Sequence, residues 1–166
     1  MTVILYTPST TRSLAYALLS LALVVAASLL GQLATYPAIP TWYAGLTKPF
    51  FTPPNAAFPI AWTILYLLMA YAFWRVLRLP AGTAGRKAAI AAYLVQLALN
   101  AGWSFAFFGA RLPWLGMVVI VALLAAIVVC WRRFRALDRP AALCLVPYFL
   151  WVLYASALNF GIAVLN

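Results

Sequence analysis

Charged residues divide this chain into long apolar stretches. The charge-free runs are 13–47, 49–74, 88–110, 112–131 and 140–166. Each run contains at least the ~20 residues that an α-helix needs to cross a bilayer. Hydrophobic residues make up 68% of the sequence and charged residues 7%, which is outside the range of soluble domains. The pattern predicts an all-α integral membrane protein, a five-transmembrane-helix bundle in which residues 1–166 form a single membrane domain.

Proline and glycine positions refine the ends of the predicted helices. Pro59 suits the first turn of a helix, residues 80–85 form a turn, and residues 109–113 form a tight reversal. We expect helices over residues 13–33, 59–79, 86–108, 114–131 and 141–164. Pro147 predicts a kink in the last of them. The fourth helix consists almost entirely of Val, Leu, Ala and Ile, which predicts a lipid-facing wall without chemistry.

The connection between the first two helices, residues 34–58 (loop 1), differs in composition from the rest of the chain. Pro49, Pro53 and Pro54 prevent a continuous helix there. Its aromatic side chains, which make it too apolar for an ordinary solvated loop, are Tyr36, Trp42, Tyr43, Phe50, Phe51 and Phe58. Long structured loops are usually functional, so we interpret loop 1 as a lid over an apolar ligand. A packed connector without a ligand is the alternative.

Basic residues are unevenly distributed between the two ends of the predicted bundle. One end receives Lys48 and Arg111. The other end receives Arg12, Arg75, Arg78, Arg86, Lys87, Arg132, Arg133, Arg135 and Arg139. The positive-inside rule places the second group in the cytoplasm, so we expect the N-terminus inside and loop 1 outside. Because topology and anionic headgroups explain the net charge of +10, we expect a lipid bilayer and no nucleic acid as partner.

Three predicted helices carry polar and aromatic residues at the i+3 and i+4 spacing of one helix face. These stripes are Trp62, Tyr66, Met69 and Phe73 on the second helix, Gln96, Asn100, Trp103 and Phe107 on the third, and Tyr148, Trp151, Ala155 and Asn159 on the fifth. In lipid, amide and indole N–H groups need partners, so the stripes should face the bundle interior. Each amide taken alone is explained by hydrogen bonding between helices. Together with loop 1, the stripes predict an apolar cavity that suits a flat, conjugated ligand.

The sequence also excludes several kinds of chemistry. It contains no His, and the charge-free runs offer no acid–base pair and no ionisable group for proton-coupled transport. Cys130 and Cys144 have no metal-ligand spacing around them. We therefore expect no metal and no cofactor. Any reaction would have to use Trp or Tyr, for example in light- or oxygen-dependent oxidation of a bound pigment.

Four motif blocks, in order and at the right intervals, resemble the translocator protein family (TspO/MBR, the peripheral-type benzodiazepine receptor). The blocks are PAIPTWYAGLTKPFFTPPN, FPIAWTILYLLMAYAFWRV, QLALNAGWSFAFFG and VPYFLWVLYASALNF, and they cover roughly Pro37 to Phe160. The resemblance implies a five-helix bundle with a ligand cavity closed by loop 1. It also implies binding of porphyrins such as protoporphyrin IX and of benzodiazepine-like ligands, and a homodimer in a bacterial cytoplasmic membrane.

The motifs and the stripes together define the candidate ligand-binding residues. These are Trp42, Tyr43, Pro49, Phe50, Trp62, Tyr66, Gln96, Asn100, Trp103, Phe107, Tyr148, Trp151, Ala155 and Asn159. The resemblance places the family's two cavity tryptophans on Trp62 and Trp151, which would be the catalytic residues if the protein is an enzyme. The C-terminal run ALNFGIAVLN lacks the aromatic and basic residues of the cholesterol-recognition motif seen in animal members, which argues against cholesterol as the ligand.

Our leading interpretation is a membrane receptor or sensor for protoporphyrin-type tetrapyrroles, with Lys48 or Arg111 as possible partners of the propionates. One alternative is an enzyme that degrades protoporphyrin with light and oxygen. Another is a transporter of tetrapyrroles or lipids, which lacks an evident coupling residue. A fourth is a structural partner protein, for which Ala98 and Gly102 on the third helix would form a dimer seam.

Overall fold

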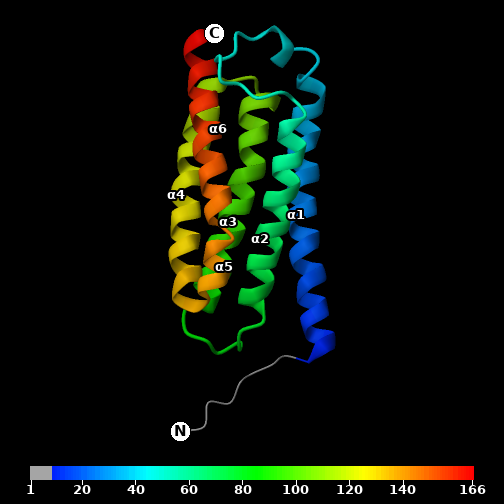
Figure 1. Cartoon of the computed structure of the whole chain (residues 1–166), viewed down its shortest axis with the longest axis vertical. Coiled ribbons are helices and arrows are strands. Elements are labelled where there is room, and N and C mark those ends of the chain that lie inside the picture. The colour runs from blue at the N-terminus through cyan, green and yellow to red at the C-terminus, as the bar shows by residue number, and fades with distance from the viewer. Residues whose placement is uncertain (1–8) are drawn as a thin grey trace.

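The structure is a computed structural model that describes residues 9–166. Its α-helices are α1 (Thr10–Ala38), α2 (Ala57–Leu77), α3 (Arg86–Ser104), α4 (Pro113–Leu137), α5 (Arg139–Leu143) and α6 (Val146–Leu165). Two short turns complete the elements: the 3₁₀ turn η1 (Tyr43–Gly45) and the π-helical turn η2 (Phe105–Gly109). Figure 1 shows the long helices side by side in one elongated bundle, with loop 1 and the C-terminus at the same end.

Five helical segments of this described part are long and apolar enough to span a membrane. They are Thr10–Ala38, Ala57–Leu77, Arg86–Gly109, Pro113–Leu137 and Arg139–Leu165. No strand occurs within residues 9–166. The predicted all-α, five-helix membrane fold is therefore confirmed.

Several helix ends differ from the expected ones. Helix α1 continues through Pro37 to Ala38, and α4 continues past Trp131 to Leu137. The last predicted helix is divided, because α5 ends at Leu143 and α6 begins at Val146. Pro147 thus lies in the first turn of α6 rather than at a kink inside a longer helix. A proline fits there because the first-turn N–H groups have no intrahelical acceptor.

The third membrane helix changes its hydrogen-bonding pattern near loop 1. After Ser104 the backbone widens into η2, where the Ala110 N–H donates to the Phe105 carbonyl at 2.7 Å. A π-helical turn places one more residue in the turn than an α-helix does, and such turns are common at functional sites. As a result the neighbouring side chains of Phe107 and Phe108 both reach the cavity described below.

The chain's only acidic residue, Asp138, fastens the end of the bundle opposite loop 1. Arg75 Nε donates to both Asp138 carboxylate oxygens at 3.0 and 3.1 Å. Asp138 also caps α5, because its Oδ1 accepts from the Ala141 N–H at 2.9 Å. One carboxylate therefore ties the end of α2 to the start of α5.

The two ends of the bundle differ in charge. The end that carries the α2–α3 and α4–α5 connections also carries the start of α1 (Figure 1). The basic residues at this end are Arg12, Arg75, Arg78, Arg86, Lys87, Arg132, Arg133, Arg135 and Arg139. Lys48 and Arg111 lie at the loop 1 end. The asymmetry read along the sequence is thus also a spatial asymmetry.

Candidate ligand-binding cavity

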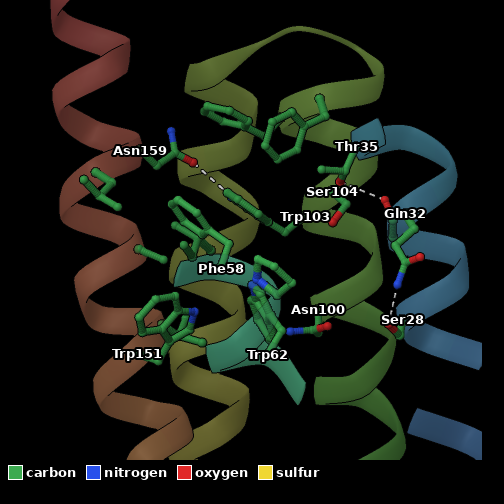
Figure 2. Close-up of a pocket in the computed structure, with 18 of the residues that line it drawn as sticks. Ser28, Gln32, Thr35, Phe58, Trp62, Asn100, Trp103, Ser104, Trp151 and Asn159 are labelled. Atoms are coloured by element: carbon green, nitrogen blue, oxygen red, sulfur yellow. Dashed lines mark hydrogen bonds between the residues drawn. The ribbon is translucent and has the colours of Figure 1, made fainter. Parts of the chain in front are cut away.

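A cavity of about 470 Å³ occupies the half of the bundle nearest loop 1. Its walls come from α1, α2, α3 and α6, with Ile120 and Leu123 contributed by α4. Tyr43 of η1 and Asn55 of loop 1 also line it. This volume lies within the range of small-molecule binding sites in proteins. Figure 2 shows the side chains that converge on it.

Aromatic side chains form one wall of the cavity. Trp62 of α2 lies beside Tyr66, with ring centroids 5.3 Å apart. Trp151 of α6 makes an edge contact with Phe58 at 6.0 Å, and both face the cavity in Figure 2. Trp103 of α3 stacks on a further lining ring, that of Phe107, at 5.3 Å. The three indoles thus come from three helices and offer flat apolar faces.

A buried amide, Asn100, joins three helices beneath this wall. Its Oδ1 accepts from the Tyr66 O–H at 2.7 Å, and its Nδ2 donates to the Tyr148 hydroxyl at 3.1 Å. Asn100 and Tyr66 line the cavity, whereas Tyr148 lies behind them and is fully buried. In an apolar interior each of these polar atoms would be costly without its partner. The network therefore fixes the polar floor of the cavity.

A second amide, Asn159, fixes the orientation of Trp103. Its Oδ1 accepts from Trp103 Nε1 at 3.0 Å, and its Nδ2 donates to the Pro113 carbonyl at 2.8 Å. Figure 2 shows the first of these bonds as a dashed line between α6 and α3. Since the Cβ of any larger residue at Gly116 would lie 2.7 Å from Asn159 Oδ1, this glycine lets α4 approach the amide closely.

The opposite wall, on α1, is polar. Ser28, Gln32 and Thr35 line the cavity, and Gln32 Nε2 donates to Ser28 Oγ at 2.9 Å. The Thr35 hydroxyl donates to the Gly31 carbonyl at 2.8 Å. A Cβ at Gly31 would lie 3.1 Å from Ser104 Oγ, so this glycine lets α1 and α3 meet here. In Figure 2 these side chains lie across the cavity from Trp62, Trp103 and Trp151.

The cavity reaches the molecular surface along the seam between α1 and α2. Its exposed lining residues are Tyr36, Asn55, Pro59 and Thr63. Tyr36 lies near the end of α1, and the other three lie just before α2 or in its first turns. The remaining lining residues are buried or half-buried. The opening is therefore lateral, and Thr63 places part of it inside a membrane-spanning helix.

Loop 1 is seated on α6 by contacts along its length. Thr47 and Asn166 exchange two hydrogen bonds of 2.9 Å, and the Tyr154 O–H donates to the Phe51 carbonyl at 2.7 Å. Pro49 packs directly against Gly161, where any Cβ would collide with the proline ring. These contacts hold the loop over the end of the bundle.

Tyr43 is the buried anchor of loop 1. Its ring lies 5.5 Å from that of Phe108, and Lys48 Nζ sits 4.7 Å above it. Burial raises the pKa of the Tyr43 phenol above its usual value of 10. The phenol therefore stays neutral over the physiological pH range.

Comparison with known proteins identifies the family. A family model described as the TspO/MBR family matches residues 20–165. The chain belongs to the TspO/MBR family. The resemblance noted in the sequence is thereby confirmed, and the protein is a multi-pass integral membrane protein of the TspO type.

Named relatives of this TspO/MBR chain come from distant organisms. The tryptophan-rich protein TspO of Archaeoglobus fulgidus is 40% identical over 155 residues, which cover 89% of this chain and 94% of the relative. The tryptophan-rich sensory protein of Cereibacter sphaeroides is 38% identical and covers 75% and 77% of the two chains. The human translocator protein is 35% identical and covers 72% and 71%.

The structure brings most of the candidate residues of this TspO/MBR protein together. Those that line the cavity are Tyr43, Trp62, Tyr66, Asn100, Trp103, Phe107, Trp151, Ala155 and Asn159. They come from η1, η2, α2, α3 and α6. Polar and aromatic residues spaced along single helix faces therefore do converge on one space.

Five candidates lie outside the cavity lining. Trp42 packs edge-on against Phe107 at 5.5 Å and supports the lining from behind, as Tyr148 does through Asn100. Pro49 contacts α6 instead, and the Phe50 side chain is 100% exposed.

Gln96, the fifth, is 1% exposed, and neither its Nε2 nor its Oε1 has a hydrogen-bond partner. It lies one helical turn before Asn100, towards the other end of the bundle.

One other expectation about the site needs correction. Helix α4 is more than a lipid-facing wall, since Ile120 and Leu123 are buried against the cavity while Val118 and Val121 are exposed. Lys48 donates to the Leu46 carbonyl at 3.3 Å, and neither it nor Arg111 lines the cavity, so their pairing with ligand propionates stays a prediction.

The candidate residues also included none from the polar wall of α1. Its signal was the spacing of Ser28, Gln32 and Thr35, which falls on one helix face within an apolar stretch.

Proposed function

We propose that this TspO/MBR-family protein is a membrane receptor or sensor that binds porphyrins of the protoporphyrin IX type, and benzodiazepine-like hydrophobic ligands, in the cavity beneath loop 1. The observation that carries the proposal is the convergence of Trp62, Trp103 and Trp151 from three helices on one space of about 470 Å³. Indole faces stack well on flat conjugated rings. The neighbouring amides would fix the orientation of such a ligand.

Loop 1 serves as the lid in this proposal. Tyr43 and Asn55 of the loop line the cavity, and the contacts with α6 hold the loop in place. Pro49 against Gly161 restricts how far the lid can shift without repacking α6. Release of a large ligand through the loop end would require these contacts to break.

Titration of the purified protein with protoporphyrin IX in the dark tests the proposal. The porphyrin absorption bands report binding, and we expect saturation at a single site per chain. The variant that combines Trp62→Phe with Trp151→Phe should bind more weakly, because each change removes indole stacking area. Trp114→Phe is the matched control, since Trp114 is 58% exposed on α4 and does not line the cavity. Absence of saturable binding, or equal affinity for all three proteins, would refute the assignment.

A second candidate function is oxidation of the bound porphyrin with light and oxygen. Trp62 and Trp151 favour it, because both indoles line the cavity and neither indole N–H has a hydrogen-bond acceptor within residues 9–166. Illuminating the same complex in air separates the two functions. An enzyme bleaches many equivalents of porphyrin per chain, faster than protein-free micelles do, and loses this activity in the Trp62→Phe/Trp151→Phe variant. A receptor leaves the bands stable.

We further propose a homodimer that forms through the outer face of α3. Ala98 is exposed, and the Cβ position of Gly102 has nothing within 4 Å, so these two positions are open to a second helix. Small residues of this kind let membrane helices approach closely. Replacing Gly102 with Leu should shift cross-linking of the protein in membranes from dimer to monomer. Unchanged cross-linking would exclude this face as the seam.

A further inference from the structure

The polar wall of α1 is built from uncharged hydrogen-bonding groups. Ser28, Gln32 and Thr35 present two hydroxyls and one carboxamide, and Ser104 adds a hydroxyl from α3. All four side chains are half-buried and line the cavity. They stand opposite the indoles in Figure 2. A flat ligand stacked on the indoles would therefore turn one edge towards α1.

The wall offers a ligand free acceptors, such as Gln32 Oε1 and Thr35 Oγ1, and also three free donors. Gln32 Nε2 uses one N–H on Ser28 Oγ, which leaves its second N–H and the Ser28 O–H available. The Thr35 O–H is already donated to the Gly31 carbonyl. No hydrogen bond of the described residues uses Ser104 Oγ. Carbonyl oxygens on the ligand edge would satisfy these donors.

The absence of charge in the described cavity lining also determines which chemical groups a ligand can place against α1. Among the described residues, none that lines the cavity is charged. A free carboxylate facing α1 would lose its hydration without gaining a cationic partner, which is expensive in an apolar site. An edge of alkyl groups would leave the donors of the wall without acceptors. A neutral carbonyl group avoids both costs.

We propose that the α1 wall makes the cavity selective for flat ligands whose edge carries neutral carbonyl groups, such as esters or amides, over ligands with free carboxylates or purely alkyl edges. The inference rests on the proposed porphyrin-type function and specifies which members of that ligand class the site prefers. Gln32 and Ser104 are the specificity-determining residues. The lateral opening between α1 and α2 lies beside this wall, at Tyr36 and Thr63.

Three porphyrins test the selectivity, each titrated into the full-length protein in nanodiscs of one lipid composition. Protoporphyrin IX dimethyl ester has the neutral carbonyl edge, protoporphyrin IX has free carboxylates, and etioporphyrin has only alkyl groups. The proteins are the wild type, Gln32→Leu and Ser104→Ala. Thr41→Val is the matched control, because its hydroxyl bonds a helix carbonyl as Thr35 does but does not line the cavity. Comparing each variant with the wild type for the same porphyrin cancels partitioning into lipid.

We expect the wild type to bind the dimethyl ester most tightly. Gln32→Leu and Ser104→Ala should each raise the Kd of the ester by roughly two- to tenfold, the effect of one lost hydrogen bond. They should leave the Kd of etioporphyrin unchanged, and Thr41→Val should change neither value. Thermal unfolding of each variant verifies that it is folded.

Two results would overturn the inference. The inference fails if Gln32→Leu and Ser104→Ala leave the Kd of the ester unchanged. It also fails if they change the Kd of the ester and the Kd of etioporphyrin by the same factor, because the α1 wall then does not distinguish ligands by the groups on their edge. If none of the three porphyrins binds the wild type, the proposed function itself fails and the selectivity falls with it. The first result leaves porphyrin binding intact, so the two failures are distinguishable.

Discussion

At the scale of single residues, Asn100 illustrates how one side chain serves both packing and the cavity. Its two amide atoms have different partners, the Tyr66 hydroxyl on α2 and the Tyr148 hydroxyl on α6. A side chain with only a donor or only an acceptor cannot satisfy both positions in the same arrangement. The amide is therefore specific to this place in the bundle.

Replacing Asn100 with Leu should destabilise the protein by about 1–3 kcal/mol, because it leaves two buried phenols unpaired. Thermal unfolding in detergent measures the loss. Tyr148→Phe is the control, since it removes a single hydrogen bond, which averages about 0.6 kcal/mol in membrane helices. Equal unfolding temperatures for Asn100→Leu and Tyr148→Phe would show that Asn100 contributes no more to stability than its single hydrogen bond with Tyr148.

Asp138 combines two interactions that a pair of substitutions can separate. Asp138→Asn removes the charge that Arg75 contacts but keeps a good N-cap for α5. Asp138→Ala removes both, so we expect it to lower stability further, by about 1 kcal/mol, the typical value of an N-cap. Thermal unfolding of the two variants and the wild type gives the order. If both variants unfold at the same temperature, the cap contributes nothing.

At the scale of elements, loop 1 depends on the close approach of Pro49 to Gly161 on α6. Gly161→Ala should push the loop off α6, because the added methyl group overlaps the proline ring, and overpacking of this kind costs about 1–3 kcal/mol. We expect faster chymotrypsin cleavage after Phe50 and Phe51, since proteolysis follows the population of the open state.

Gly82→Ala is the matched control for this experiment. Nothing lies within 4 Å of the Cβ position at Gly82, which is in the turn between α2 and α3. This substitution should leave cleavage of loop 1 unchanged. A Gly161→Ala variant that is cut at the wild-type rate would contradict the view that this contact holds the loop.

The limits of sequence reasoning also appear at this scale. Residue spacing on α3 correctly placed Asn100, Trp103 and Phe107 on one cavity-facing stripe, because helical periodicity determines the face of a residue. It could not determine depth, so Gln96 on the same stripe lies below the cavity. Depth depends on where neighbouring helices diverge, which is a tertiary property.

Loop 1 and α1 show two further reasons why the sequence alone did not predict the whole cavity lining. In an irregular loop no periodicity says which side chains turn inward, so Tyr43 is buried while Phe50 is fully exposed. On α1, the hydroxyl and amide side chains are scattered among Leu, Ala and Val, so hydropathy does not set them apart from the apolar residues around them. The fold followed from hydropathy alone, whereas the α1 wall needed the spatial arrangement.

At the scale of the whole molecule, the uneven distribution of basic residues predicts the orientation in the membrane. The end with the α2–α3 connection should face the cytoplasm, and loop 1 should face the opposite side. Single cysteines test this in a Cys130→Ala/Cys144→Ala background. A membrane-impermeant maleimide added to intact cells should label Ala44→Cys of loop 1, which is exposed. Ala84→Cys, exposed in the α2–α3 turn, should react only after permeabilisation. The reverse pattern would invert the topology.

The lateral opening of the cavity determines from which phase a ligand would enter, and therefore which concentration sets the occupancy of the cavity. Because Thr63 belongs to both the opening and a membrane-spanning helix, a hydrophobic ligand can arrive from the acyl chains without returning to water. Occupancy of the cavity is then set by the chemical potential of the ligand in the bilayer, which depends on its mole fraction in the lipid. At a fixed total amount of ligand, adding empty bilayer dilutes the ligand and lowers occupancy, although the protein is unchanged. The occupancy of such a protein would follow the ratio of ligand to lipid in its membrane.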